Sequence, residues 1–442
     1  ICRNRGVALR IGVNHGSLSD RIMNQYGDTP AGMVQSAMEF GAVCRKHDFH
    51  YIVFSMKSSN PLIMVEAYRL LVEKMRHHGW DYPLHLGVTE AGAGDDGRIK
   101  SCIGDTIRMS LTEDPVHEIL PSKKLVHFCS HYPPVMTMLQ PRREKKTFLS
   151  ALYLNRETLA TDACKQQLGI DLAGKKTPYC PDLLILENDP ADPNLRLWLV
   201  ELNIPILSFT KATCFIPIYQ KLPEKPVQPY AFFCEELQDL PGDASWILVA
   251  PKQPRQQITQ ELLAATKAPV IMYFSYKGDK QDVLTAASCE LGALLLKGVG
   301  NGMCLDADLP LNELSSLTFS LLQAARLKTV KTEFISCPSC GRTLFDLENV
   351  SRRIRKKTAH LPGIRIAIMG CIVNGPGEMA DADFGDVGSK PGKVDLYVGK
   401  KCVQKAIDFA QADNALIALI KKHGKWIAPP TPASIAVVNA TS

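Results

Sequence analysis

The sequence is poor in several features that would assign it to a common class. No apolar run approaches the eighteen or so residues of a membrane-spanning helix, so we expect no membrane partner. The positive excess is small, with 51 Lys and Arg against 45 Asp and Glu. This balance argues against a dedicated nucleic-acid binder, although it suits an anionic small substrate. The remaining composition, 45% apolar and 22% charged, is that of an ordinary globular protein, and 442 residues allow two to four domains.

An initiator methionine is also missing. The chain opens on Ile1 and enters a strand-like segment almost at once. We therefore expect a fragment or a processed form, in which a targeting peptide can be neither recognised nor excluded.

Disulfide-type cysteine spacing is absent as well. Eleven of the fourteen cysteines are scattered singly, so a reducing compartment is expected. The other three form the most informative pattern in the chain. Cys337 and Cys340 make a CxxC, and Cys371 follows thirty residues later at the start of CIVNGPGE, which ends at Glu378. Three thiolates and one carboxylate make four candidate ligands, and the weaker carboxylate could yield its place to a substrate.

The chemistry of these ligands favours one kind of centre. Cysteine thiolates are the standard ligands of iron-sulfur clusters, which points to a 4Fe-4S cluster. Gly375 and Gly377 would let the backbone pass close to such a bulky inorganic body. Spacing alone leaves two alternatives open, a structural zinc site completed by His360 and an unligated redox pair of thiols.

From residue 7 to residue 118, strand-like and helical patterns alternate. Two helices are predicted to start at Thr29 and Asn60, each a cap residue followed by proline. Buried parallel strands are predicted at four apolar runs, Ala8 to Val13, Tyr51 to Met56, Leu84 to Thr89 and Thr106 to Leu111.

Polar side chains follow or lie on these predicted strands. The ends carry Asn14, Lys57 and Glu90, and the fourth strand carries Arg108 and Ser110. In parallel α/β sheets and barrels, active sites form at the carboxyl ends of the strands. Taken singly, each polar group could merely end a strand at solvent, but four in a row indicate a site. Lys57, Arg108 and Arg10 are suited to phosphate, the arginines through a bidentate fork.

The rest of the chain divides into three predicted parts. Residues 119–325 suggest an inserted α/β domain without a catalytic constellation, residues 326–426 a cluster domain with a basic helix at Asn349 to Lys357, and residues 427–442 a disordered tail. In the inserted domain, helices are expected at Gln257 to Thr266 and Pro310 to Leu327. Strands are expected there at Leu183 to Leu186, Leu195 to Val200, Ile204 to Ser208, Trp246 to Val249, Val270 to Phe274 and Leu294 to Leu296.

Six segments together resemble the 4-hydroxy-3-methylbut-2-enyl diphosphate synthases, the iron-sulfur enzymes of the non-mevalonate isoprenoid pathway. They are RIGVNHGSL (10–18), FSMKSSNP (54–61), HLGVTEAGAG (85–94), IGDTIRMSLTEDP (103–115), CPSCGRTLFDL (337–347) and GCIVNGPGE (370–378). The middle of the chain is similar to the inserted domain of the family's three-domain form.

The resemblance implies a TIM-barrel domain that binds 2-C-methyl-D-erythritol 2,4-cyclodiphosphate, and a reductase-like domain that closes a 4Fe-4S cluster over the barrel mouth. It implies reductive ring opening with two electrons from ferredoxin or flavodoxin. Glu90 would be the acid that protonates the departing hydroxyl, because a carboxyl in a water-poor site keeps its proton to higher pH. The cluster ligands would be Cys337, Cys340, Cys371 and Glu378. The substrate-binding residues would be Arg10, Asn14, Lys57, Arg108, Ser110 and Asn374.

Two departures from the family are expected to matter. The chain holds the sequence of only the last four barrel strands, within residues 1–118, and about ten residues are missing between Gly104 and Asp105. A six-residue strand is about 20 Å long, so a helix returning along it needs roughly thirteen residues. Only Ala91 to Asp105 is available for the helix and both of its loops, which is too short for such a crossover. We therefore expect a half-barrel with two open edges, self-association into a homodimer, and no turnover by the chain as written.

Two functions from other classes compete with the enzyme. One is a non-catalytic iron-sulfur electron carrier, and the other is a zinc-stabilised structural protein. The expected location is the cytoplasm, with the plastid stroma as the alternative.

Overall fold

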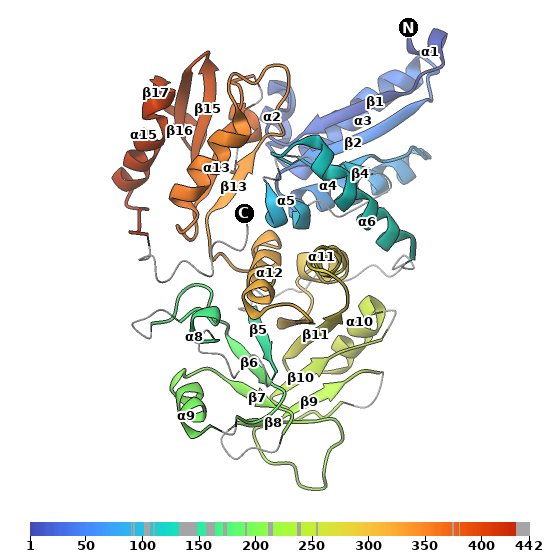
Figure 1. Ribbon diagram of the computed structural model, residues 1–442. Helices are drawn as coiled ribbons and strands as arrows, with labels where there is room; N and C mark the ends of the chain where they lie inside the picture. Colours follow the sequence, from blue (N-terminus) through green and yellow to red (C-terminus); the bar gives the residue numbers. More distant parts are fainter. Residues whose placement is uncertain are drawn as a thin grey trace. The chain divides into compact units, whose positions relative to one another are not determined.

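Figure 1 shows the computed structural model of the chain. The structure describes residues 1–89, 91, 93–100, 107–108, 111–131, 148–155, 164–170, 175–190, 192–210, 215–236, 240–252, 255–373, 375–379 and 381–429. The described residues form two compact units. One unit contains residues 1–126 and 331–429, and the other contains residues 127–330. The predicted tail therefore lies almost wholly outside the described residues.

The first unit begins with a four-stranded parallel sheet. Its strands are β1 (Leu9–Asn14), β2 (Ile52–Ser58), β3 (Leu86–Val88) and β4 (Ile107–Arg108), and they pair in sequence order. Two long helices connect the first three strands, α3 (Pro30–Lys46) and α4 (Pro61–His77). The shorter helices of this region are α1 (Cys2–Arg5), α2 (Asp20–Tyr26), the 3₁₀ turn Pro115–Glu118 and α6 (Ile119–His131).

The starts of both long helices confirm the prediction from sequence. The Thr29 hydroxyl accepts from the Gly32 amide at 3.2 Å, and the Asn60 side chain accepts from the Leu62 amide at 3.1 Å. Both helices pack an apolar face on the sheet, where Met33 and Leu71 are fully buried. Each such side chain contributes about 1.5–3 kcal/mol through burial.

The described part of the crossover between β3 and β4 contains one short helix. This helix, α5 (Gly94–Lys100), has seven residues. At about 1.5 Å per residue these seven residues cover roughly 10 Å, and the total length of the crossover helix stays a prediction. The predicted deletion itself, at Gly104 and Asp105, lies outside the described residues.

The second part of this unit is a five-stranded mixed sheet. Strands β13 (Glu333–Ser336), β14 (Arg365–Met369) and β15 (Phe384–Lys390) are parallel, and β16 (Lys393–Val398) and β17 (Lys401–Asp408) continue antiparallel. Helices α13 (Leu347–Thr358) and α15 (Phe409–Lys422) pack on one face. The predicted basic helix is α13, which starts two residues earlier than expected because Asp346 caps the Asn349 amide at 3.1 Å. The short helix α14 (Gly375–Glu378) follows Cys371.

The second unit is a closed barrel of eight parallel strands. This corrects the prediction for the inserted region, whose closure the sequence did not reveal. Around the barrel the strands are β5 (Leu149–Leu154), β6 (Leu183–Leu186), β7 (Ile206–Ser208), β8 (Ile216–Tyr219), β9 (Ala231–Cys234), β10 (Trp246–Val249), β11 (Val270–Tyr276) and β12 (Gly302–Ala307). Its helices are α8 (Cys164–Gln167), α9 (Pro193–Glu201), α10 (Arg255–Ala265), α11 (Lys280–Leu296) and α12 (Leu311–Ala324).

Two predicted strands of the inserted region are wrong, because they are helical. Leu195 to Val200 lies inside α9, and Leu294 to Leu296 is the end of α11. Short apolar runs do not distinguish a buried strand from a buried helix. The sequence signals for these two helices were their capping residues. Asp192 accepts from the Asn194 amide at 2.9 Å at the start of α9, and Asp279 forms a capping box with Asp282 at the start of α11. Among the helices that the structure describes, none has the length and apolarity needed to cross a bilayer.

Candidate functional site

Two of the predicted ligands lie at one edge of the mixed sheet. Cys337 directly follows β13, and Cys371 follows β14 after Gly370. Because β13 and β14 are parallel neighbours, their carboxyl ends meet at the same edge. The Gly370 amide donates to Cys337 Sγ at 3.3 Å, so the backbone next to Cys371 contacts the first thiol.

The third cysteine is held by a tight turn. Ser339 has a positive φ of 72°, and the Cys340 amide donates to the Thr343 hydroxyl at 2.9 Å. The Arg342 amide lies 3.5 Å from Cys340 Sγ. This backbone contact, together with the guanidinium of Arg342, lowers the pKa of the Cys340 thiol and favours its thiolate.

Arg342 also marks where the candidate ligands gather. The charges of Cys340, Cys371 and Glu378 all raise the pKa of its guanidinium, with the hydrogen bond to Cys340 as the largest cause. One exposed cation therefore faces three of the four predicted ligands. Sequence reasoning overlooked Arg342, although its place directly after CPSCG was a usable signal.

The fourth predicted ligand contacts the parallel sheet. Asn14, at the end of β1, donates through Nδ2 to Glu378 Oε1 at 2.8 Å. The side chain predicted to bind substrate and the carboxylate predicted to bind metal are thus hydrogen-bonded partners. No sequence pattern could show this, because 364 residues separate the two.

Two glycine loops bring the sheets together at this point. A Cβ on Gly16 would lie 1.9 Å from the Gly377 carbonyl oxygen, and one on Gly377 would lie 2.4 Å from the Gly16 oxygen. Gly16 also has a positive φ of 83°. The prediction gave Gly377 a different purpose, close passage of an inorganic body. In the structure its closest neighbour is the backbone of the β1 loop, and Gly375 packs on Met369 and Val387.

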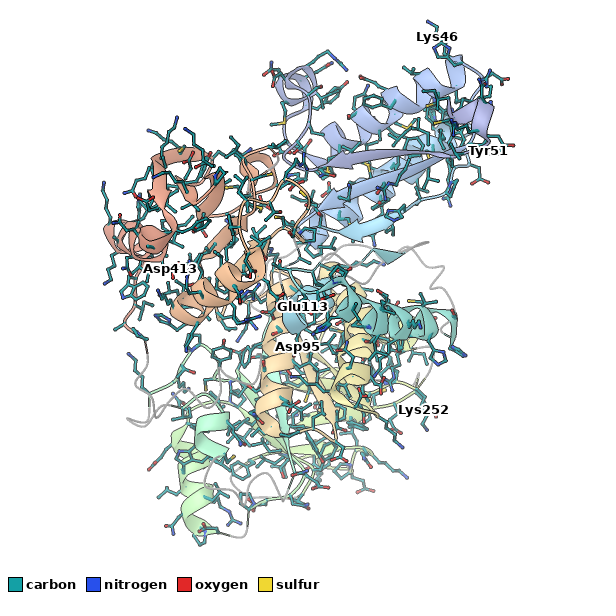
Figure 2. All side chains as sticks on the ribbon, turned by 45° about the horizontal axis from the view of Figure 1, so that its top comes forward. Lys46, Tyr51, Asp95, Glu113, Lys252 and Asp413 are labelled. Atoms are coloured by element: carbon teal, nitrogen blue, oxygen red, sulfur yellow. The ribbon has the colours of Figure 1, made fainter. Side chains whose placement is uncertain are left out.

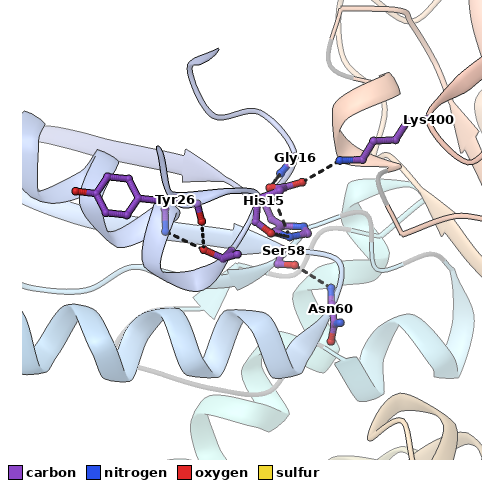
Figure 3. A network of polar contacts seen from close by, with 9 residues as sticks. His15, Gly16, Tyr26, Ser58, Asn60 and Lys400 are labelled. Carbon is purple, nitrogen blue, oxygen red and sulfur yellow. Dashed lines mark hydrogen bonds and ion pairs between the residues drawn. The ribbon is translucent and has the colours of Figure 1, made fainter. Parts of the chain in front are cut away.

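Asp28 holds the same loop in place, and Figure 3 labels three residues that it contacts, His15, Gly16 and Lys400. It accepts from the Gly16 amide at 2.8 Å, and its other oxygen lies 3.4 Å from Lys400 Nζ. His15 Nε2 lies 3.2 Å from the Asp28 carbonyl oxygen. One carboxylate therefore links the loop after β1 to the turn between β16 and β17.

A further contact joins the first cysteine to the region after β4. The Thr112 hydroxyl lies 2.6 Å from Ser336 Oγ and donates to the Cys337 carbonyl at 3.2 Å. Ala91 forms an isolated parallel bridge with Ser336. The segments after β1, β3 and β4 thus all reach the cysteine-bearing edge.

The structure places three of the predicted substrate residues on one face of the parallel sheet. Asn14 is paired in register with Lys57, and Lys57 Nζ lies 3.9 Å from the Cβ position of Gly12. Arg10 lies two residues before Gly12, so it shares their face, and both are exposed. Lys57 is therefore the neighbour of the Asn14–Glu378 contact, and Arg10 lies further along the same face of β1.

Of the remaining predicted residues, only Arg108 belongs to the described part of the chain. Arg108 lies in β4, where its backbone pairs with Gly87, and its side chain is outside the described set. Glu90, Ser110 and Asn374 lie outside the described residues altogether.

The zinc alternative finds no support in the position of His360. Its Nε2 lies 2.9 Å from the Ile427 carbonyl oxygen, and its ring packs edge-on against Trp426. Within the described part of the chain, no three His, Cys, Asp or Glu side chains converge closely enough for one ion. A single ion requires such convergence, whereas the ligands of a cluster bind different iron atoms.

Fold and contacts together define an α/β protein in which a parallel sheet meets a cysteine-bearing sheet edge, the arrangement of a candidate metal-cluster oxidoreductase. Comparison with known proteins is specific. Residues 1–123 match the model of the GcpE TIM-barrel domain, and residues 333–422 match that of the GcpE protein C-terminal domain. The chain belongs to this family of 4-hydroxy-3-methylbut-2-en-1-yl diphosphate synthases, which confirms the resemblance.

The similarity extends over most of the chain. It is 44% identical to the flavodoxin-type synthase of Protochlamydia amoebophila, over 97% of this chain and 76% of the relative. It is 40% identical to the chloroplastic ferredoxin-type synthases of Arabidopsis thaliana and Oryza sativa, over 97% of this chain and 69% of each relative.

Proposed function

We propose that this chain serves the reductive ring opening of 2-C-methyl-D-erythritol 2,4-cyclodiphosphate to (E)-4-hydroxy-3-methylbut-2-enyl diphosphate. Family membership supports the reaction, and the observation that carries the site is the hydrogen bond between Asn14 and Glu378. It joins the cationic face of the parallel sheet to the cysteine-bearing edge, as a reaction between a bound diphosphate and a reducing centre requires.

A 4Fe-4S cluster fits the residues present. Cys337 and Cys371 follow neighbouring parallel strands, and Cys340 lies in the turn beside them with its thiolate favoured by Arg342. Thiolates are the ligands that such clusters take, and a carboxylate is a weaker fourth donor. Once bound, the cluster would pass on, one at a time, the two electrons that a flavodoxin or ferredoxin supplies for the ring opening.

The chain's own residues would bind and orient the substrate. Lys57 and Arg10 offer positive charge for the diphosphate on the exposed face of β1 and β2. Asn14 would hold Glu378 until substrate arrives and could then turn its amide to a substrate oxygen, since an amide donates equally well to either acceptor. We further assign Arg108, Ser110 and Asn374 to substrate binding and Glu90 to proton donation.

The parallel sheet itself we interpret as the last four strands of the family's barrel. Four parallel strands in sequence order, with α3 and α4 connecting the first three, support this reading. The closed barrel of residues 148–307 would then be the inserted domain. The electron donor would be a flavodoxin or ferredoxin, as the relatives' names state.

Spectroscopy of the Glu378 site tests the proposal directly. The protein is reconstituted anaerobically with iron and sulfide, reduced, and examined by electron paramagnetic resonance with and without the cyclic diphosphate. We expect a cluster signal that changes on adding the cyclic diphosphate. Glu378→Ala should retain most of the iron, because three thiolates anchor it, but should alter the substrate-free spectrum.

The matched control is Glu348→Ala, which removes an exposed glutamate that pairs with Arg352 in the same unit. It should leave both spectra unchanged. A cluster spectrum that does not change when the cyclic diphosphate is added would contradict the proposed function and favour a simple electron carrier. Product analysis of the same samples tests the ring opening itself.

A further inference from the structure

The interior of the closed barrel is filled in layers. In barrels of this kind, each layer takes four inward side chains from alternate strands, and branched aliphatic residues dominate. One layer here follows that rule, with Ala151, Leu207, Ala231 and Ile271 from β5, β7, β9 and β11, each 0% exposed. The next inward position on the same four strands lies nearer the carboxyl end, because inward residues alternate along a strand.

That next layer is entirely aromatic. It consists of Tyr153, Phe209, Phe233 and Tyr273. Phe209 still belongs to the ladder, since its amide donates to the Leu186 carbonyl at 3.1 Å. The rings meet edge to face, with centroids 5.4 Å apart for Phe209 and Phe233, 5.8 Å for Phe233 and Tyr273, and 5.8 Å for Tyr273 and Tyr153. An aromatic layer replaces the usual aliphatic one at the end of the barrel where active sites form.

The aromatic layer is the last one that closes the lumen among the described residues. Tyr153, Phe209 and Phe233 are partly exposed, whereas the four side chains below them are fully buried. Beyond this layer, Ser275 of β11 and Glu235, which directly follows β9, are exposed. Ring faces or edges at this level are therefore accessible to a small solute.

The groups around this layer are mainly acidic. Glu187 continues β6, because its amide donates to the Leu154 carbonyl at 3.0 Å, and Asp306 lies on β12 in register with Ser275. Lys252, labelled in Figure 2, lies 3.9 Å from Glu235 and 3.7 Å from Glu236. Arg255 donates to the Ser275 carbonyl at 2.9 Å and is paired with Glu290 at 3.1 Å. Four carboxylates, Glu187, Glu235, Glu236 and Asp306, thus stand against Lys252 and this paired arginine.

The nearby carboxylates also act on the pKa values of the two tyrosines. Burial, followed by the charges of Glu187 and Asp306, raises the pKa of Tyr153 to about 12. Burial raises the pKa of Tyr273 as well, and the charge of Asp306 and a hydrogen bond to it add to the rise. A negative field over aromatic rings disfavours anions and favours cations.

We propose that the carboxyl-end mouth of this barrel binds a small organic ammonium ion, seated against the aromatic layer and balanced by Glu187 and Asp306. Ring quadrupoles attract such ions at their faces, and carboxylates supply the counter-charge. The inference rests on the second unit alone and does not depend on the proposed function. It gives the inserted domain a ligand, where the sequence predicted only a geometric role.

Choline and 3,3-dimethylbutan-1-ol, its uncharged carbon isostere, are the probes that test this site. Binding of each to the full chain is measured by calorimetry at low salt. We expect saturable binding of choline at least about tenfold tighter than that of the alcohol, because only choline carries the charge. Equal binding of the two, or binding of neither, would overturn the proposal.

Variants then locate the site. Asp306→Asn should weaken choline binding about fivefold to tenfold and leave the alcohol unaffected. Phe233→Leu removes one ring while keeping an apolar side chain, and should weaken choline binding similarly. Phe40→Leu, at a ring 60% exposed in the other unit, is the control and should change nothing. Because Asp306 is partly exposed, its variant still decides the question if Phe233→Leu does not fold.

Discussion

The chain contains two parallel β/α assemblies, and only one of them closes. Strands β5 to β12 form a barrel in which every strand has two neighbours, and all four residues of β6 are 0% exposed. Strands β1 to β4 form an open sheet, and Arg10 and Gly12 of β1 are exposed on one face. Closure buries the inward faces of strands in a packed lumen, whereas an open sheet keeps one face available.

The difference explains where the candidate chemistry lies. The open sheet offers Lys57 and Asn14 on its free face, and the cysteine-bearing edge reaches that sheet through Glu378. The barrel has no free strand face among its described residues and offers only its mouth. A lumen filled by side chains restricts ligands to one end, as in other barrels of eight parallel strands.

The largest effect on this comparison is expected at the Gly16–Gly377 contact. Gly16→Ala should destabilise the first unit by about 3 kcal/mol, because the new Cβ clashes with a backbone oxygen and the φ is positive. Gly79→Ala is the matched control, since Gly79 has a φ of 63° but nothing within 4 Å of its Cβ position. It should cost about 1 kcal/mol.

Hydrogen exchange followed by mass spectrometry distinguishes the units. Protection should fall in β1 and in β13 to β15 for Gly16→Ala, and stay unchanged in β5 to β12. Equal losses for Gly16→Ala and Gly79→Ala would show that the loop contact contributes nothing.

A pH-dependent effect is expected at Asp386, in β15. Both of its carboxylate oxygens are buried without a hydrogen-bond partner in the described structure. Burial and the nearby charge of Asp413 raise its pKa to about 7, partly offset by Arg353. The folded state holds the Asp386 proton more tightly than the unfolded state does. Proton binding at Asp386 therefore stabilises the fold fully below about pH 4, and this stabilisation is lost as pH rises to 7.

Asp386→Asn should therefore raise the free energy of unfolding at pH 8 by a few kcal/mol, at about 1.4 kcal/mol per pKa unit, and by little at pH 4. Chemical denaturation across this range measures it. Asp413→Asn should instead destabilise, because Asp413 accepts from Arg353 Nε and Lys357 Nζ, each at 2.7 Å. If the free energies of unfolding of Asp386→Asn and the parent chain differed by the same amount at every pH, the raised pKa of Asp386 would be contradicted.

The smallest effect is expected at the amino-terminal end of the barrel. Lys328 Nζ lies 2.5 Å from Asp182 and donates to Ser150 Oγ at 3.0 Å, which ties the chain after α12 to β5 and β6. Lys328→Ala should destabilise the barrel by about 1 kcal/mol, the usual value for a partly exposed ion pair. Exchange protection should decrease in β5 and β6 and remain unchanged in β1 to β4. A decrease in both sheets would show that the two units are energetically coupled.

Local sequence signals predicted much of the open sheet. Thr29-Pro30 and Asn60-Pro61 fix the starts of α3 and α4, because capping and proline geometry act over a few residues. The barrel escaped prediction, since strands such as β8 have four residues and include Pro217, which argues against a central strand. Closure depends on how all eight strands pair, and no local pattern carries that information.

The candidate site likewise has a part that local sequence signals predicted and a part that they did not. The CxxC and the third cysteine could be recognised as candidate ligands because their spacing can be read directly from the sequence. The partnership of Asn14 with Glu378 and the contact of Gly16 with Gly377 were not visible, because both join residues more than 350 positions apart. Such contacts follow from packing of one sheet against another, which a single sequence does not reveal.

The central claim is that three cysteines at this edge hold a cluster, and the iron and acid-labile sulfide bound per chain test it most directly. Cys371→Ser is compared with Cys402→Ser, which alters a cysteine of the same unit whose thiol contacts the Gln404 carbonyl at 3.6 Å. We predict that Cys371→Ser loses most of its iron and sulfide, whereas Cys402→Ser binds as much of both as the parent chain. Equal contents in the two variants, whether high or low, would contradict the account.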